Sequence, residues 1–414
     1  MIKYVIGYVA FLLIAFLLRD NKNSSTKLNW LTVLYGIVFQ IALVFAITNL
    51  PICITALESI ANGVMKLKDA TLKGTEFVFG YIGGGAAPFE VKSQNNMFSL
   101  AFQALPTVIL VGVLSAILTY LKILPLIAKI IGFIFKFVFR IKESIGLVSA
   151  AKIFLGQLEA PLLIKPQLPY ISRSDMFIVL SLAFATTSAA VMPVYASAIQ
   201  SVCPDAMKHI ITSSVINVIS VLILSSIIMP SSNSELNISA ELENAESKPY
   251  PNFMGAMSKG LSDGMFVWWC IVGSLVGMVA LITFVNYIFA LFPDIGGSPI
   301  TLQRICGIFM YPFAWLIGIQ SQDLTAISQV LGEKLVLNEI IAFFDLAKSG
   351  VSHESVVKTI YAINNFGNFA CIGITVGGLM AMAPSQKHIA TLAWRAFITG
   401  LLATGLTSSL VNFF

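Results

Sequence analysis

The chain has 414 residues, of which 57% are hydrophobic and 11% charged, and its net charge is +5. An ordinary soluble domain carries roughly 25% charged residues. The composition therefore excludes a soluble globular enzyme, a nucleic-acid-binding protein and a disordered protein. It is typical of a polytopic α-helical membrane protein, whose apolar surface faces lipid and whose loops carry a small basic excess.

The cysteines and histidines form no recognisable ligand pattern. No CxxC pair occurs among the cysteines, and the three histidines, His209, His353 and His388, lie far apart in the chain. We therefore expect no disulfide framework, no metal site and no cofactor. The apolar run Tyr4–Leu18 lacks a small-residue cleavage site after it, so we expect a retained first helix rather than a signal peptide.

Apolar segments long enough to span a bilayer recur along the chain. A spanning helix needs roughly 17–25 residues, and these segments are Ile2–Leu18, Leu31–Ile52, Phe98–Leu121, Met176–Gln200, Ile210–Met229, Met265–Phe292 and Ile389–Phe414. The lysine-bearing segments Leu57–Lys73 and Ile123–Ile141 are typical of helices that lie in the membrane interface. The polar segment Pro230–Lys259 divides the chain into two halves.

Two apolar stretches contain polar residues, which cost at least ~2.5–3.5 kcal/mol each at mid-membrane when charged. They are Glu143–Tyr170, with Lys152, Gln157 and Glu159, and Leu331–Leu346, with Asn338 and Glu339. Each stretch precedes a long apolar segment with small polar residues partway, and then one more apolar helix. Paired broken segments at corresponding positions of two halves indicate a transporter's midplane site. A single Glu beside an Asn has an equally good explanation as an interhelical hydrogen-bonding group.

The motifs of these stretches also resemble those of a known family. They are FVFGYIGGG (77–85), FQALPTVI (102–109), GQLEAPLL (156–163), PFAWLIGI (312–319), LGEKLVLNEIIAF (331–343), NFGNFACIGI (365–374) and MAPS (382–385). In their order and spacing the chain resembles a concentrative nucleoside transporter, of the bacterial nucleoside permease type. The first 76 residues resemble this family only in being hydrophobic.

The resemblance implies an all-α polytopic membrane protein of the bacterial inner membrane. It implies about eight transmembrane helices, two re-entrant helical hairpins in inverted repeats, and a homotrimer surrounded by membrane lipid. The implied division is a scaffold at 1–142, a first repeat at 143–230, a soluble loop at 231–264, a scaffold helix with a connecting segment at 265–322, and a second repeat at 323–414.

The resemblance also implies where a nucleoside substrate binds. The first hairpin would contact the nucleobase, and the second hairpin with the following helix would contact the ribose. The residues are Gly156, Gln157, Leu158 and Glu159 for the base, and Asn338, Glu339, Asn368 and Cys371 for the sugar. The chemistry agrees, because an ionised carboxylate accepts hydrogen bonds from both vicinal hydroxyls of a ribose, and a carboxamide both donates and accepts.

Two of these positions depart from the family pattern. Leu158 stands where the first hairpin usually has threonine, and Cys371 stands where many members have serine. The alternatives left open are a changed base preference, another ribosylated or base-like solute, and a Cys371 that merely fills space.

A third departure concerns the coupling ion. Sodium-driven members of the family use an Asn side chain and a Ser side chain, and the corresponding residues are Lys152 and Ala190, with Ser188 nearby. A lysine cation would repel a sodium ion by roughly 4 kcal/mol at about 4 Å. We therefore expect proton coupling without sodium. The alternatives are a Lys152 that reaches water at the hairpin mouth, and a sodium-coupled or facilitative transporter.

Other function classes lack their motifs. The sequence has no P-loop for ATP-driven transport and no HExxH or GxSxG motif for an intramembrane enzyme. We expect no enzyme. A channel or a structural membrane protein would not require repeated carboxylate-bearing hairpins.

Overall fold

The computed structural model describes residues 2–20, 28–91, 97–165, 167–230, 250–294 and 299–411, and within them all regular secondary structure is helical. Five helical segments are long and apolar enough to cross a membrane: Trp30–Asn49, Leu100–Tyr120, Ala206–Ile228, Phe253–Phe289 and His388–Leu410. The predicted class, an all-α membrane protein, is confirmed.

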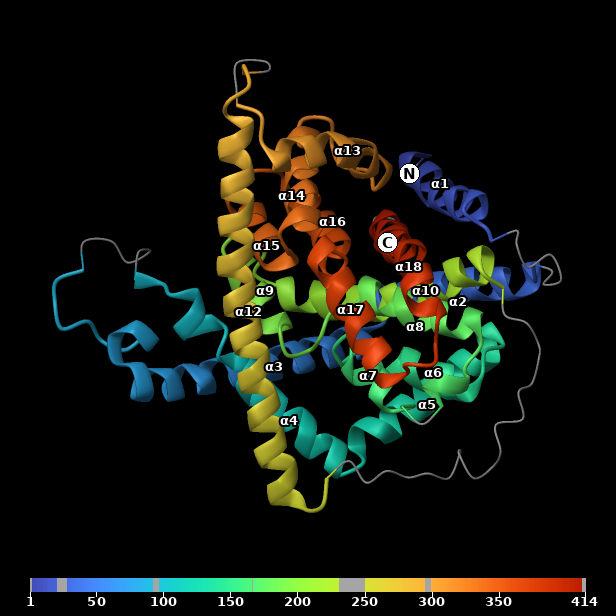
Figure 1. Cartoon of the computed structure of the whole chain (residues 1–414), viewed down its shortest axis with the longest axis horizontal. Helices are drawn as coiled ribbons and strands as arrows, with labels where there is room; N and C mark the ends of the chain where they lie inside the picture. Colours follow the sequence, from blue (N-terminus) through green and yellow to red (C-terminus); the bar gives the residue numbers. More distant parts are fainter. Residues whose placement is uncertain are drawn as a thin grey trace.

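The helices before the first polar stretch are distributed around the molecule, with α1 and α2 on the right of the view and α3 and the segment after it towards the left (Figure 1). They are α1 (Ile2–Leu17), α2 (Trp30–Asn49), α3 (Pro51–Phe79), the short turn η1 (Gly80–Gly83), the π-helical turn η3 (Leu100–Ala104), α4 (Thr107–Tyr120) and α5 (Ile123–Phe139).

The later helices follow the same order twice. The first set is α6 (Glu143–Ala151), α7 (Glu159–Leu162), η4 (Leu168–Tyr170), α8 (Arg173–Ala185), α9 (Met192–Ile199) and α10 (Ala206–Ile228). After α12 (Phe253–Phe289) and α13 (Leu302–Leu316), the second set is α14 (Leu324–Val336), α15 (Glu339–Lys348), α16 (His353–Ile363), α17 (Phe369–Met382) and α18 (His388–Leu410). Each set contains a helix–turn–helix hairpin, a broken helix and a long final helix.

Helix α12 runs upright through the view, between the segment that projects to the left and the rest of the molecule, and packs against α4 (Figure 1). Small residues allow the two backbones to approach closely, because a Cβ on Gly260 would lie 2.8 Å from the Ala116 side chain and 2.8 Å from the Gly112 carbonyl oxygen. Such small-residue contacts are typical of membrane helix pairs. The helix begins at Phe253, within the segment predicted as a soluble loop at 231–264, of which residues 231–249 lie outside the described part of the chain.

The apolar segment Met176–Gln200, predicted to be long enough to span a bilayer, is not one continuous helix. Helix α8 ends at Ala185 and α9 begins at Met192, with Thr186 in extended conformation between them. The Thr-Thr-Ser run offers the backbone side-chain hydrogen bonds that compete with a helix. Pro193 then lacks a backbone N–H and would clash with the preceding turn, so it is placed where a new helix starts.

The two broken helices meet at their breaks. The amide of Phe366, between α16 and α17, donates to the carbonyl of Thr186, between α8 and α9, at 3.2 Å. Nearby, the side-chain nitrogen of Asn364, Nδ2, donates to the carbonyl of Ile210 in α10 at 2.8 Å. The Thr186 carbonyl at the first break is therefore satisfied by a backbone amide from the other half of the chain, as burial requires.

Polar contacts also connect the N-terminal helices to the later ones. The Tyr8 hydroxyl donates to Gln40 Oε1 at 2.8 Å, and the Gln40 amide donates to Ser220 Oγ at 2.6 Å. Ser220 in turn pairs with Thr407 at 2.7 Å, so one buried chain of hydrogen bonds joins α1, α2, α10 and α18. The N-terminal helices are thus an integral part of the packed structure.

We predict that Gly367→Ala destabilises the protein by about 1–3 kcal/mol, because overpacking costs that much where neighbours cannot move. A Cβ at Gly367 would lie 2.8 Å from Asn365 Oδ1, 3.1 Å from Lys334 Nζ and 3.1 Å from the Phe184 carbonyl. Gly373→Ala is the matched control, because nothing lies within 4 Å of its Cβ position. Thermal unfolding of the two purified variants in one detergent is the measurement, and equal midpoints would contradict the prediction.

Candidate functional site

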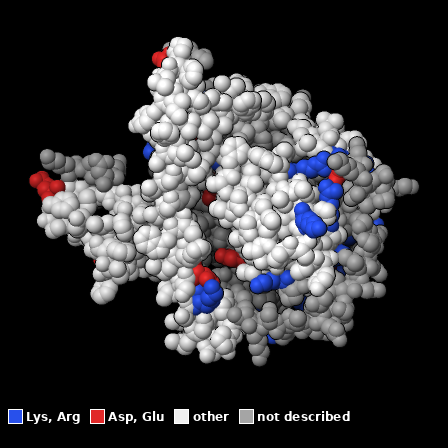
Figure 2. Space-filling model, in the orientation of Figure 1, with Lys and Arg blue, Asp and Glu red and all other residues white. Residues whose placement is uncertain are grey.

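A large cavity of about 2680 Å³ opens on the face beside α12. Its lining includes the turns of both hairpins, with Gln157 and Glu159 from the first and Asn338 and Glu339 from the second. Figure 2 shows acidic side chains within the recess that runs alongside α12. The two polar stretches of the sequence therefore contribute to one hollow.

Glu339 is the most enclosed carboxylate of this cavity, with 5% of the residue exposed. It is the first residue of α15, whose N-terminal dipole favours a negative charge. Its Oε1 accepts a hydrogen bond from the Tyr195 hydroxyl at 2.9 Å, and its Oε2 accepts one from the Asn368 amide at 3.2 Å. These contacts hold the carboxylate in one orientation and leave lone pairs for further donors.

Two asparagines of the site begin helices. The side-chain oxygen of Asn338 accepts from the amide of Ile341 at the start of α15, at 3.0 Å. The side-chain oxygen of Asn368 accepts from the amide of Cys371 at the start of α17, at 2.9 Å. Asparagine is a preferred residue at such positions, so part of its hydrogen-bonding capacity serves the fold. Asn368 uses its nitrogen on Glu339, which makes it an orienting residue for that carboxylate.

The tip of the first hairpin contacts α17 through two of the predicted residues. Gln157 Oε1 accepts from the Thr375 hydroxyl at 3.0 Å. Leu158 packs against Gly378, where a Cβ would lie 2.4 Å from the leucine Cδ1. Glu159 is exposed, and its carboxylate accepts from the Gly156 amide at 3.0 Å. Gly156, Gln157, Leu158 and Glu159 all line the cavity together with Asn338, Glu339, Asn368 and Cys371.

The predicted ion-coupling residues divide into two environments. Ser188 and Ala190 line the cavity at the break between α8 and α9, where Ser188 Oγ accepts from the Ala190 amide at 3.3 Å. Lys152 is fully buried at the end of α6, and its Nζ has no hydrogen-bond partner among the described residues. The alternative that Lys152 reaches water at the hairpin mouth is therefore wrong, because the amine is buried, whereas its part in ion coupling stays a prediction.

Two central residues were missed from the sequence. Tyr195 is buried, stacks on Phe343 with ring centroids 4.7 Å apart, and contacts Glu339 from a distance of 144 residues along the chain. Lys334 is 1% exposed and donates to Asn365 Oδ1 and to the Gly367 carbonyl. Tyr195 gave no signal, since tyrosine is common in apolar segments. Lys334 gave the same signal as Lys152, a charge within an apolar frame.

Comparison with known proteins identifies this arrangement. Family models described as the N-terminus and the C-terminus of Na+ dependent nucleoside transporters match residues 6–82 and 209–412. A third model, described as nucleoside recognition, matches residues 101–202. The chain belongs to the concentrative nucleoside transporter family. The match over 6–82 corrects the view that the first 76 residues share only hydrophobicity with the family.

Individual relatives are similar to this chain over almost its whole length. The E. coli protein called putative nucleoside permease NupX is 27% identical over 100% of this chain and 98% of its own. Mouse solute carrier family 28 member 3 is also 27% identical, over 98% of this chain, which spans 58% of that relative's length. A solved structure of CNTnw in an inward-facing substrate-bound state matches with a TM-score of 0.87 at 25% identity, covering 100% and 98% of the two chains. The apolar helices and the bacterial relatives make this chain a multi-pass protein of the inner membrane.

We predict opposite effects on stability when the two buried lysines are replaced. Lys334→Met leaves the buried Gly367 carbonyl without its lysine donor, at a cost of about 1–3 kcal/mol, and removes one of the two donors to Asn365 Oδ1, which keeps the Gly367 amide. Lys152→Met removes a buried amine that has no partner, which relieves a desolvation cost and raises the free energy of unfolding.

The measurement is thermal unfolding of both variants and the wild type, side by side in one detergent. A midpoint that falls for Lys334→Met and rises for Lys152→Met is expected. A lowered midpoint for Lys152→Met would mean that the amine has a partner, and an unchanged midpoint for Lys334→Met would contradict its role in holding the break.

Proposed function

We propose that this protein imports nucleosides across the inner membrane as a secondary active transporter and is not an enzyme. The observation that carries this proposal is the Glu339 carboxylate, buried at the wall of the cavity and oriented by Tyr195 and Asn368. The family membership and the relatives named nucleoside permeases support the same substrate class.

The ribose is the part of the substrate that Glu339 recognises in this proposal. Vicinal hydroxyls are two adjacent donors, and the carboxylate keeps acceptor capacity after binding Tyr195 and Asn368. A substrate that lacks a hydroxyl would leave a buried carboxylate oxygen unpaired, which discriminates strongly against it. Asn338 and Cys371 complete this side of the cavity.

The nucleobase is assigned to the first hairpin. Gln157 keeps its amide nitrogen as a donor because its oxygen is engaged by Thr375, and Glu159 is an exposed acceptor at the cavity wall. Leu158 packs against Gly378 of α17. With leucine in place of the family's threonine, this position packs on α17 and makes no polar contact through a hydroxyl. This difference favours a base preference unlike that of the commoner family pattern, or another ribosylated or base-like solute as the second candidate.

Proton coupling without sodium is the proposed driving mechanism. Lys152 is the observation behind it, because a buried amine without a partner favours the neutral form and readily exchanges a proton when its surroundings change. When protonated, the same amine would also oppose a sodium ion nearby. The family description names sodium dependence, so sodium coupling is the competing outcome.

The architecture that accompanies this proposal is the one implied by the family. It comprises about eight spans, two re-entrant hairpins, inverted repeats at 143–230 and 323–414, scaffold parts at 1–142 and 265–322, and a homotrimer. The repeated helix order supports the two repeats. The exposed apolar side chains of α12, among them Phe266, Trp269 and Phe284, suit contact with lipid or with a neighbouring protomer.

We predict that Glu339→Gln weakens nucleoside binding about 10- to 100-fold, since a hydrogen bond to a charged group contributes about 1.5–3 kcal/mol. Calorimetric titration of the purified variant with uridine and adenosine is the measurement. The control is Glu90→Gln, an exposed carboxylate outside the cavity lining. Unchanged affinity in a folded Glu339→Gln protein would refute the ribose assignment.

We predict that uptake into proteoliposomes is driven by an acid-outside gradient in sodium-free buffer. Lys152→Asn is expected to abolish or reduce this drive, because it removes the buried amine. Lys165→Asn is the matched control, since Lys165 follows the same hairpin but is exposed. Concentrative uptake that requires a sodium gradient at constant pH would overturn proton coupling and favour the sodium alternative.

A further inference from the structure

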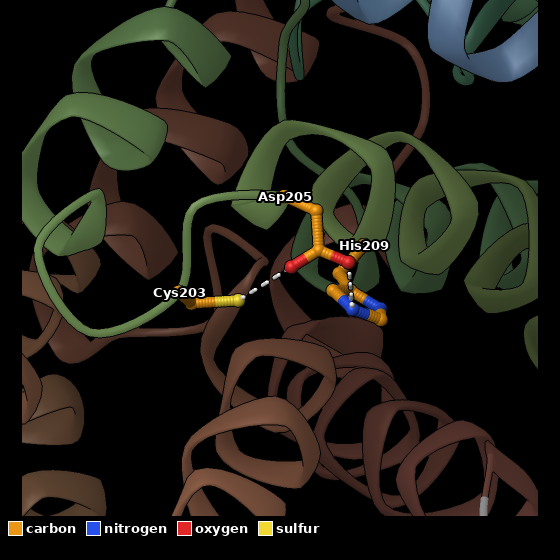
Figure 3. A group of neighbouring side chains, drawn as sticks. All are labelled: Cys203, Asp205 and His209. Atoms are coloured by element: carbon orange, nitrogen blue, oxygen red, sulfur yellow. Dashed lines mark hydrogen bonds and ion pairs between the residues drawn. The ribbon is translucent and has the colours of Figure 1, made fainter.

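Outside the nucleoside cavity, three side chains with metal-ligating atoms gather where α9 ends and α10 begins (Figure 3). They are Cys203, Asp205 and His209, and one ligand atom from each lies within 4.8 Å of the others. The Cys203 thiol donates to Asp205 Oδ1 at 3.4 Å, and His209 Nε2 is 3.4 Å from Asp205 Oδ2. In Figure 3 the carboxylate lies between the sulfur and the ring.

We propose that this group, the Cys203–Asp205–His209 cluster, binds a transition-metal cation of the zinc class. Thiolate, imidazole and carboxylate are the three protein ligands that zinc combines. Calcium and magnesium require sets of oxygen ligands, and the cluster offers one carboxylate only. Three protein ligands leave the fourth tetrahedral position open for water.

The histidine is held as a metal-bound histidine would be. Its other ring nitrogen, Nδ1, is 3.2 Å from the hydroxyl of Tyr361, a buried residue of α16. Metal-ligating histidines almost always use their second nitrogen in a hydrogen bond of this kind, because it fixes the ring orientation and the tautomer. Tyr361 therefore directs Nε2 towards Asp205, where the metal would lie. This contact is independent of the cluster's own hydrogen bonds.

Metal binding would replace the protons that now occupy the cluster. The metal takes the place of the thiol proton of Cys203, which is released to solvent as the sulfur becomes a thiolate. In the metal-bound form the imidazole is neutral with its single proton on Nδ1, where it donates to the Tyr361 oxygen. Any proton between Nε2 and Asp205 is displaced, so that Nε2 supplies its lone pair to the metal. Access is through the carboxylate, because the Asp205 side chain is 55% exposed while Cys203 is buried.

The position of the cluster ties it to the rest of the fold. Helix α9 carries Tyr195, which contacts Glu339, and ends shortly before Cys203. The same connection also contacts α16. Nδ1 of His353, the first residue of α16, lies 3.3 Å from the Val202 carbonyl. A metal bound here would restrain the segment between α9 and α10 where the two halves of the chain meet.

The test is calorimetric titration of the full-length purified protein in detergent with Zn²⁺, and cobalt absorption spectroscopy to detect a thiolate ligand. We expect one zinc per chain, with affinity lowered about 10- to 100-fold or more by Cys203→Ser and by His209→Gln. The matched controls are Cys270→Ser and His388→Gln, which remove an exposed cysteine and an exposed histidine elsewhere and should bind zinc as the wild type does.

Two readouts keep the test decisive. Thermal unfolding without metal shows whether each variant folds. If His209→Gln does not fold, Cys203→Ser alone serves as the test variant. A cobalt spectrum with a sulfur charge-transfer band that disappears in Cys203→Ser supports the site. Absence of zinc binding by the wild type, or equal zinc affinity in wild type and Cys203→Ser, would overturn the proposal.

Discussion

The contact between the two helix breaks is the constraint on which the candidate site depends. A break inside an apolar protein leaves amides and carbonyls that must find partners, because unpaired backbone groups are costly away from water. Here the Phe366 amide bonds to the Thr186 carbonyl, and Lys334 bonds to Asn365 and to the Gly367 carbonyl. Each break is thereby stabilised by groups from elsewhere in the chain, and buried Lys334 connects α14 to the second break.

The helices around the two breaks also explain how the Glu339 carboxylate is accommodated in a buried position. Glu339 begins a helix, accepts from Tyr195 on α9 and accepts from Asn368 at the start of α17. Three separate elements therefore orient one acceptor group. Preorganisation of this kind reduces the ordering cost of binding, because the polar groups already have their places before a ligand arrives. The asparagines serve two purposes at once, since they cap helices and face the cavity.

The two buried lysines show that similar sequence signals have different physical meanings. Lys334 donates to a carbonyl and to a carboxamide oxygen, which makes it part of the scaffold. Lys152 has no hydrogen-bond partner among the described residues, and a group of that kind needs an explanation beyond stability. Its place at the end of α6, next to the hairpin tip, supports a part in coupling.

The Cys203–Asp205–His209 cluster follows the end of α9, the helix that carries Tyr195. A metal bound there would be a second point at which this region is restrained.

The sequence alone determined the membrane class, the two polar stretches and Glu339 as a candidate site residue. A charged residue within an apolar segment costs free energy whatever the packing of the helices, so it can be recognised without a structure. Tertiary structure decided the rest. The break after Ala185 overrode an apolar run that reads as one span, and Tyr195 reached Glu339 only because α9 packs on α15. The Cys203–Asp205–His209 cluster spans a few residues, but its spacing matches no common motif, and the Tyr361 contact that helps to orient its histidine comes from α16. Contacts between residues far apart in the chain depend on how helices pack, which periodicity and composition do not encode.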